Sequence, residues 1–181
     1  MGKLLAILAI VFSCAATPAE PDFELDAIAD AFRFEGVHTT YEWRDCGMVN
    51  AFYDPHRRHI LLCNELRDLE PGAVRYIFAH ELSHGVIMQR GVPYTTSHEG
   101  AADELAALWL VVIGRADDVY AGARFWRGLG RDENPYDDHF SDLRRAHSLE
   151  CIARGAQGKS FMCTLEYRRI VKTWIRLLEI K

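Results

Sequence analysis

Several features that would point to other classes of protein are missing from this 181-residue sequence. No stripe of Lys and Arg runs along the chain, and the net charge is −5. A nucleic-acid partner, which needs a clustered basic surface, is therefore not expected. The absence of a C-x-x-C pair argues against a zinc site built from thiolates. There is no internal repeat, and the apolar content of 49% predicts one domain with a substantial core.

The N-terminal apolar run, residues 4–12, is too short for a helix that stays in a membrane. A lysine precedes it and small residues follow it, which is the pattern of a secretory signal peptide over residues 1–19. Two cleavages compete: a plain cut after one of the following alanines, or a lipoprotein cut before Cys14, which would attach the chain to a membrane by lipid. We predict an exported protein, periplasmic or secreted, with its mature domain over residues 20–181.

The chain divides into a short strand-rich part and a longer helical part. The first part holds a weak amphipathic helix and three runs rich in β-branched and aromatic residues, which predict a small antiparallel sheet. The second part has helical spacing, with a stop signal at Gly91 and Pro93. The expected helices and strands are 22–34, 38–43, 48–53, 59–63, 71–90, 97–114, 117–130, 140–154 and 163–180. This order predicts an α+β fold, a small antiparallel sheet followed by a mainly helical domain.

Without Cys14 the cysteines are even in number, and export favours disulfides. Cys46 precedes a predicted strand whose partner ends at Cys63, so a hairpin could bring the two within bridging range. Cys151 and Cys163 bracket a glycine-containing loop between two predicted helices. Of the three connectivities, we favour the sequence-local one, Cys46–Cys63 and Cys151–Cys163.

The stretch AHELSHG, residues 79–85, has the H-E-x-x-H pattern. On a helix, residues four apart point the same way one turn up, so His80 and His84 can reach one metal ion. Glu81 stands beside them, where it can take a proton from metal-bound water. The pattern alone also fits a helix that merely carries two histidines, so a third ligand is needed.

The next predicted helix supplies a candidate third ligand. Glu99 and Asp103 are four apart on this helix, and the break at Gly91 lets it fold back against the first. Glu99 can then complete a His-His-Glu zinc site, with Asp103 accepting the other ring N–H of a ligand histidine. Alternatively, Asp103 or His98 is the third ligand, or Glu99 forms a capping box with Thr96.

With these residues the chain resembles the gluzincin metallopeptidases, in which H-E-x-x-H is followed by E-x-x-x-D on the next helix. It resembles most a bacterial family of metallopeptidases formerly classed as a domain of unknown function. The resemblance covers about residues 35–178. The matching residues are 49–55, 60–66, 80–84, 99–103, 138–139, Arg144, Cys151, 163–167 and Trp174.

The resemblance implies further roles. Asn50, Ala51 and Phe52 look like the edge strand that binds substrate by main-chain hydrogen bonds in such enzymes. His139 is the implied donor to the oxyanion of the transition state, with Tyr136 or Tyr94 as alternatives. The resemblance also implies a zincin-like fold and supports the two disulfide pairs. The chain departs from the usual family pattern at His98 and Gly100.

The sequence as a whole therefore predicts a zinc-dependent peptidase that binds one Zn²⁺ and acts on a peptide or protein substrate. Glu81 would serve as the general base. The main alternative is a catalytically inactive, metal-stabilised binding or scaffold protein, and a second is a metal-free structural domain. Oligomeric state and substrate identity do not follow from the sequence.

Overall fold

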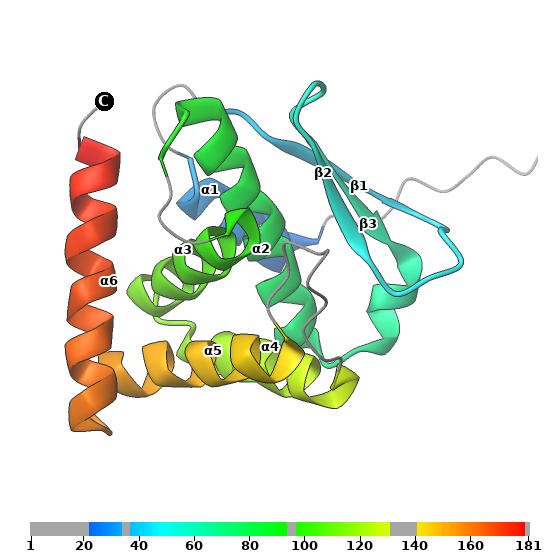
Figure 1. Ribbon diagram of the computed structural model, residues 1–181. Helices are drawn as coiled ribbons and strands as arrows, with labels where there is room; N and C mark the ends of the chain where they lie inside the picture. Colours follow the sequence, from blue (N-terminus) through cyan, green and yellow to red (C-terminus); the bar gives the residue numbers. More distant parts are fainter. Residues whose placement is uncertain (1–21, 34–36, 94–96, 131–140, 180–181) are drawn as a thin grey trace, which may run out of the picture.

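The computed structural model describes residues 22–33, 37–93, 97–130 and 141–179 (Figure 1). The predicted signal peptide, Cys14, His139 and the alternatives Tyr94 and Tyr136 lie outside these residues. The elements are α1 (Phe23–Ala31), β1 (Thr40–Arg44), β2 (Ala51–Asp54), β3 (His59–Cys63), the 3₁₀ helix η1 (Asn64–Asp68), α2 (Pro71–Arg90), α3 (His98–Val112), α4 (Ala116–Leu129), α5 (Asp142–Ala156) and α6 (Phe161–Glu179). The predicted α+β order, a small sheet followed by helices, is confirmed.

The three strands form a mixed sheet in the order β1-β3-β2, so the prediction of a wholly antiparallel sheet is wrong. β2 and β3 are antiparallel, with Ala51 opposite Leu62, whereas β1 runs parallel to β3. The physical reason is burial. β3 carries Ile60, Leu62 and Cys63, each 0% exposed, whereas the exposed residues of β1 are polar or charged. The most apolar strand takes the central place, and the half-exposed strands take the edges.

Helix α2 is the central element, with the sheet on one side and α3 and α4 on the other (Figure 1). Pro71 stands in its first turn, and Gly91 ends it in the left-handed conformation at φ 56°. The sheet approaches α2 closely at Gly85, where an added Cβ would lie 3.2 Å from the Tyr53 ring of β2 and 2.9 Å from Oγ1 of Thr39, directly before β1. Most of α2 is therefore buried, including the predicted histidine motif.

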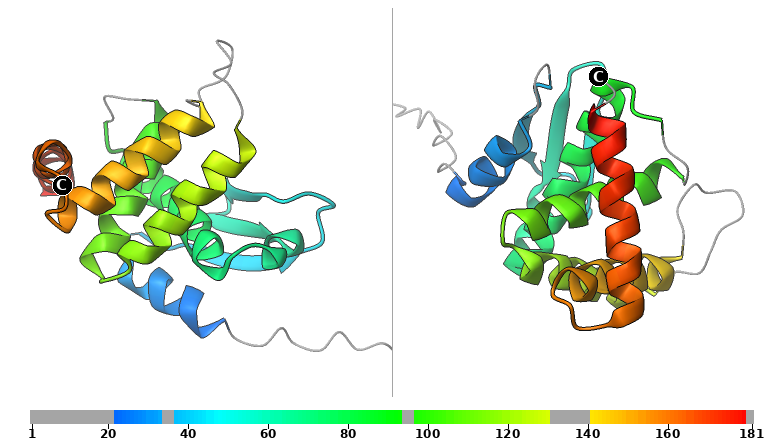
Figure 2. Two further views of the ribbon diagram at one scale, coloured as in Figure 1. Left: turned by 90° about the horizontal axis from the view of Figure 1, so that it is seen from below. Right: turned by 90° about the vertical axis from the view of Figure 1, so that its left-hand side faces the viewer.

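Helices α3 and α4 cover the other side of α2, and α5 and α6 pack outside them. Leu105 and Leu110 of α3 are fully buried, as expected for a helix that is apolar almost all round. α4 and α5 lie side by side, and α6 packs against α5 and α3 through its buried residues Ile170 and Trp174 (Figure 2). Within the described ranges, no helix combines the length and apolar character needed to cross a membrane.

Both expected disulfides are present. Cys46 and Cys63 are bonded, with their Cα atoms 5.3 Å apart, and join the loop after β1 to the end of β3. Cys151 and Cys163 are bonded, with their Cα atoms 4.9 Å apart, and join α5 to α6. The bonded cysteines are 17 and 12 residues apart, so both bonds have the sequence-local pairing that was predicted.

Candidate metal centre

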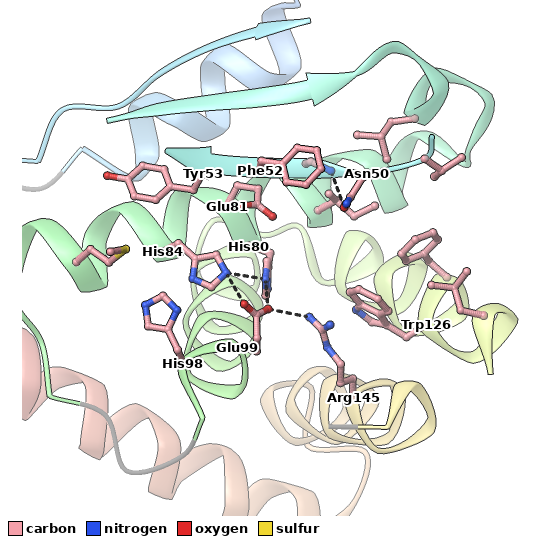
Figure 3. Close-up of a pocket in the computed structure, with 17 residues that line it drawn as sticks. Asn50, Phe52, Tyr53, His80, Glu81, His84, His98, Glu99, Trp126 and Arg145 are labelled. Carbon is pink, nitrogen blue, oxygen red and sulfur yellow. Dashed lines mark hydrogen bonds and ion pairs between the residues drawn. The ribbon is translucent and has the colours of Figure 1, made fainter. Parts of the chain in front are cut away.

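The histidine motif lies in the third and fourth turns of α2, with its side chains pointing into one cleft (Figure 3). His80, Glu81 and His84 are 5%, 8% and 7% exposed. The Nε2 atoms of His80 and His84 are 3.0 Å apart, so the two imidazoles converge on one point. The helical spacing thus has the consequence expected from the sequence: two nitrogen donors and a carboxylate at one place on one helix.

Glu99, in the first turn of α3, brings its carboxylate to the same point (Figure 3). Its Oε2 lies 3.1 Å from His80 Nε2, and its Oε1 lies 3.3 Å from His84 Nε2. The helix is capped by Ser97, whose hydroxyl accepts the Gly100 N–H at 3.0 Å. The carboxylate of Glu99 thus lies at the two imidazoles. Thr96, its partner in the capping-box alternative, lies outside the described residues.

The three donors have the spacing of a tetrahedral zinc site. Bonds of about 2.0–2.2 Å to zinc give ligand-to-ligand distances of about 3.3–3.6 Å in a tetrahedron. The distances of 3.0, 3.1 and 3.3 Å among His80, His84 and Glu99 are close to that value. Two imidazoles and one carboxylate are also a ligand set that catalytic zinc accepts, and they leave a fourth position open. The residues present therefore fit a zinc ion.

Asp103, one turn after Glu99 on α3, lies behind His80. Its Oδ1 is 2.9 Å from His80 Nδ1 and accepts a 2.5 Å hydrogen bond from the Tyr76 hydroxyl. A carboxylate at this position fixes the ring orientation and tautomer of a ligand histidine. The structure brings Asp103 beside the histidine that the sequence predicts it to orient, and the orienting role itself stays a prediction.

Arg145 of α5 completes the group and was not predicted. Its Nε and Nη2 donate to the two oxygens of Asp103 at 2.7 and 2.9 Å, and Nη2 lies 3.9 Å from Glu99. The guanidinium stacks on the Trp126 ring at 3.6 Å. Its side chain is only 2% exposed. Arg145 lies 42 residues from Asp103 and belongs to no motif. Nothing in a single sequence therefore indicates that it contacts the centre.

The pKa values at the centre show a surplus of negative charge. Burial opposes a proton on His80, but Asp103 and Glu99 outweigh it and raise the pKa of His80 to about 10. Burial would also raise the pKa of Asp103, yet Arg145 and His80 hold it well below its usual range. Contacts with the two histidines likewise lower the pKa of Glu99 against the effect of burial. For Glu81 burial prevails, and its pKa is raised.

The centre opens into a cleft of about 520 Å³. One side of the cleft is formed by β2 and the residues before it, including Asn50, Ala51 and Phe52, so the structure brings these predicted substrate-binding residues to the centre (Figure 3). Five apolar side chains of the lining form what we call the apolar end of the cleft, and one of them, Trp126, lies against Arg145. That end is lined by Leu66, Ile77, Phe125, Trp126 and Leu129.

Comparison with known proteins assigns the family. Residues 67–178 match a family described as "Putative metallopeptidase". The chain belongs to this metallopeptidase family. The match spans more than half of the chain and includes all the helices that carry the centre, while β2 and the rest of the sheet precede it. No curated protein and no solved structure matches the chain.

A metallopeptidase requires a metal ion. Membership of this family therefore fits the convergence of the donor atoms of α2 and α3. Besides His80 and His84, one further histidine among the described residues lines the cleft, His98, directly before Glu99. The ring of His98 stacks on that of His84, with centroids 4.5 Å apart and planes inclined by 23°. The sequence marked His98 only as an alternative ligand and a departure from the family pattern.

Proposed function

We propose that this family member is an exported zinc-dependent peptidase. His80, His84 and Glu99 would hold one Zn²⁺, since their donor atoms lie 3.0–3.3 Å from one another. A zinc ion bound by these residues supplies a Lewis acid that activates water near neutral pH and polarises the carbonyl to be cleaved. The two disulfides are consistent with export, because such bonds persist in oxidising compartments.

The charge of the centre supports a divalent ion. Three buried or half-buried carboxylates, Glu81, Glu99 and Asp103, face one permanent cation, Arg145. Two negative charges remain, and buried charge is costly unless it is paired. The raised pKa of His80, about 10, fits this surplus, because a proton partly compensates it. A divalent cation would balance the charge of the three carboxylates without protons.

Glu81 is the residue we assign to proton transfer. Its carboxylate oxygen lies within 4.8 Å of donor atoms of His80 and His84, and the buried side chain lines the cleft. A buried carboxylate with a raised pKa is a better base than one in water. It would accept a proton from the attacking water and return it to the amine that leaves. Asp103 and Arg145 would hold His80 in place during this step.

Two parts of the cleft suit a peptide. The strand β2 lies at the edge of the sheet next to the centre, where an extended substrate can add as a further strand. The apolar end formed around Ile77 and Trp126 would accept an apolar side chain of the substrate. Both features favour an extended peptide over a small polar molecule.

The convergence of the His80, His84 and Glu99 donors beside buried Glu81 is the observation that carries this proposal. The test is Glu81→Gln in the full chain with its disulfides intact. Zinc content should stay at one ion per chain, while cleavage of a peptide mixture, followed by mass spectrometry, should fall by about 10²–10⁴-fold.

A matched control is Glu104→Gln, which changes a carboxylate on α3 that hydrogen-bonds Trp174 and lies outside the cleft lining. This control should keep both zinc and activity. Retained cleavage in Glu81→Gln would refute the role of Glu81. Wild-type chain that binds zinc but cleaves no peptide would favour the scaffold alternative, and a chain that binds no zinc would refute the metal centre.

A further inference from the structure

The histidine next to the ligand glutamate is placed for metal chemistry that the proposed triad does not require. Donor atoms of His84, His98 and Glu99 lie within 4.8 Å of one another. This second group shares two of its three members with the triad of His80, His84 and Glu99. His98 is half-buried and lines the cleft, whereas His80 is only 5% exposed. The donors therefore run from the cleft toward the interior, with His98 as the outer member and His80 as the inner one.

The stacked arrangement does not suit His98 as a resting ligand of the ion that His84 would hold. An imidazole binds a metal through a nitrogen lone pair that lies in the plane of its ring. The rings of His84 and His98 are inclined by only 23°, with centroids 4.5 Å apart. Two ring planes at this angle and distance intersect far from both rings. A single ion therefore cannot lie in both ring planes and also be at bonding distance from both rings. His98 must leave the stack before it can bind an ion near Glu99.

We propose that His98 is a metal-transfer ligand. It binds an incoming divalent ion at the open side of the cleft together with Glu99, and His80 then replaces it as the ion moves inward. Because Glu99 belongs to both groups, the transfer exchanges ligands one at a time and never requires a bare ion. Zinc permits such an exchange, since it can expand from four to five ligands. This inference rests on the proposed zinc site, and it adds a route of entry to it.

A transfer ligand leaves a kinetic signature that a resting ligand does not. If His98 takes part only on the way in and out, its loss slows uptake and release by the same factor and leaves the dissociation constant unchanged. If His98 were a resting ligand, its loss would speed release and weaken binding. If it contacted only substrate, neither rate would change. The two rate constants therefore separate the three roles without any measurement of activity.

The experiment uses the full chain, stripped of metal and with its disulfides intact. Stopped-flow mixing with Zn²⁺ gives the uptake rate, and mixing of the zinc-loaded chain with excess chromogenic chelator gives the release rate. His98→Phe keeps a ring that can stack on His84 but removes the donor. We expect both rates to fall by about tenfold, with the dissociation constant within about twofold of the wild-type value.

Two further variants complete the design. His98→Asp retains a donor at the helix start and should restore most of both rates, which also tests whether His98→Phe acts through loss of folding. His147→Gln, an exposed histidine on α5, should leave both rates unchanged. Equal rates in His98→Phe and wild type would overturn the proposal, as would faster release with weaker binding. A wild-type chain that takes up no zinc would instead refute the metal site itself.

Discussion

Arg145→Met should destabilise the metal-free chain far more than the loss of a surface arginine. Arg145 and Asp103 form two hydrogen bonds, at 2.7 and 2.9 Å, and their side chains are only 2% and 7% exposed. Removing one partner of a buried ion pair typically costs about 3–5 kcal/mol, because the other charge stays buried. Tyr76 and His80 would still contact Asp103, so we expect the lower end of this range, about 3 kcal/mol.

Urea unfolding followed by tryptophan fluorescence measures this cost. For an unfolding slope of about 2 kcal/mol per molar urea, a loss of about 3 kcal/mol lowers the midpoint by about 1.5 M. The control is Arg127→Met, which removes a partner of Glu150 in a pair with side chains 49% and 28% exposed. Such a surface pair contributes about 0–1 kcal/mol, so its midpoint should move by less than about 0.5 M.

A double-mutant cycle identifies the cause. Asp103→Asn removes the charge that Arg145→Met leaves unpaired, so the double variant should be more stable than the sum of the two single losses predicts. We expect a coupling of about 1.5–3 kcal/mol, at the upper end for residues in direct contact. The reasoning is refuted if Arg145→Met is no more harmful than Arg127→Met, or if the two changes at the centre are additive.

Two smaller changes test the packing and the cleft. Gly122→Ala should cost about 1–3 kcal/mol in urea unfolding, because the added Cβ would meet the Tyr76 ring at 2.3 Å, whereas Gly128→Ala meets nothing within 4 Å and should cost nothing. Equal effects would show that α2 and α4 are not packed this closely. Trp126→Ala should raise KM for peptides with large apolar side chains more than for peptides with small ones, and an equal rise for both would remove the apolar end of the cleft from specificity.

The helical half could be predicted because its signals are local. Apolar residues at helical spacing, with Pro71 and Gly91 at the ends, predict α2 over the range that the structure shows. The four-residue spacings within α2 and α3 also predict that the histidines, Glu99 and Asp103 each share a face. The αα-hairpin then leaves one way for the two faces to meet, and the distances between Glu99 and the histidines follow from it.

Contacts between distant segments could not be predicted in this way. Arg145 meets Asp103 across 42 residues, and neither periodicity nor spacing connects α5 with α3. The role of Trp126 at the cleft likewise depends on how α4 and α5 pack against each other. In both cases the partner is chosen by burial and shape complementarity in three dimensions, which a single sequence does not display.

In the sheet, such a long-range choice determines whether β2 has the free edge that the proposed substrate binding requires. A meander that followed chain order would put β2 in the centre, bonded on both sides and closed to a substrate strand. In the observed order β1-β3-β2, β2 pairs, among the described residues, only with β3. The Cys63 N–H donates to Asn50 O at 3.1 Å, so alternation along an antiparallel strand turns the backbone of Ala51 and Tyr53 outward.

The outward edge of β2 is not uniformly available, however. The Ala51 N–H already donates to Asn50 Oδ1 at 2.9 Å. A peptide that binds there exchanges one hydrogen bond for another, which changes the free energy little. The backbone groups of Tyr53 make no such hydrogen bond to the Asn50 side chain. Phe52, whose ring is exposed, lies between Ala51 and Tyr53 in the strand. We therefore expect affinity along this edge to come from Tyr53 and from the apolar end of the cleft, with Ala51 setting the register of the bound strand.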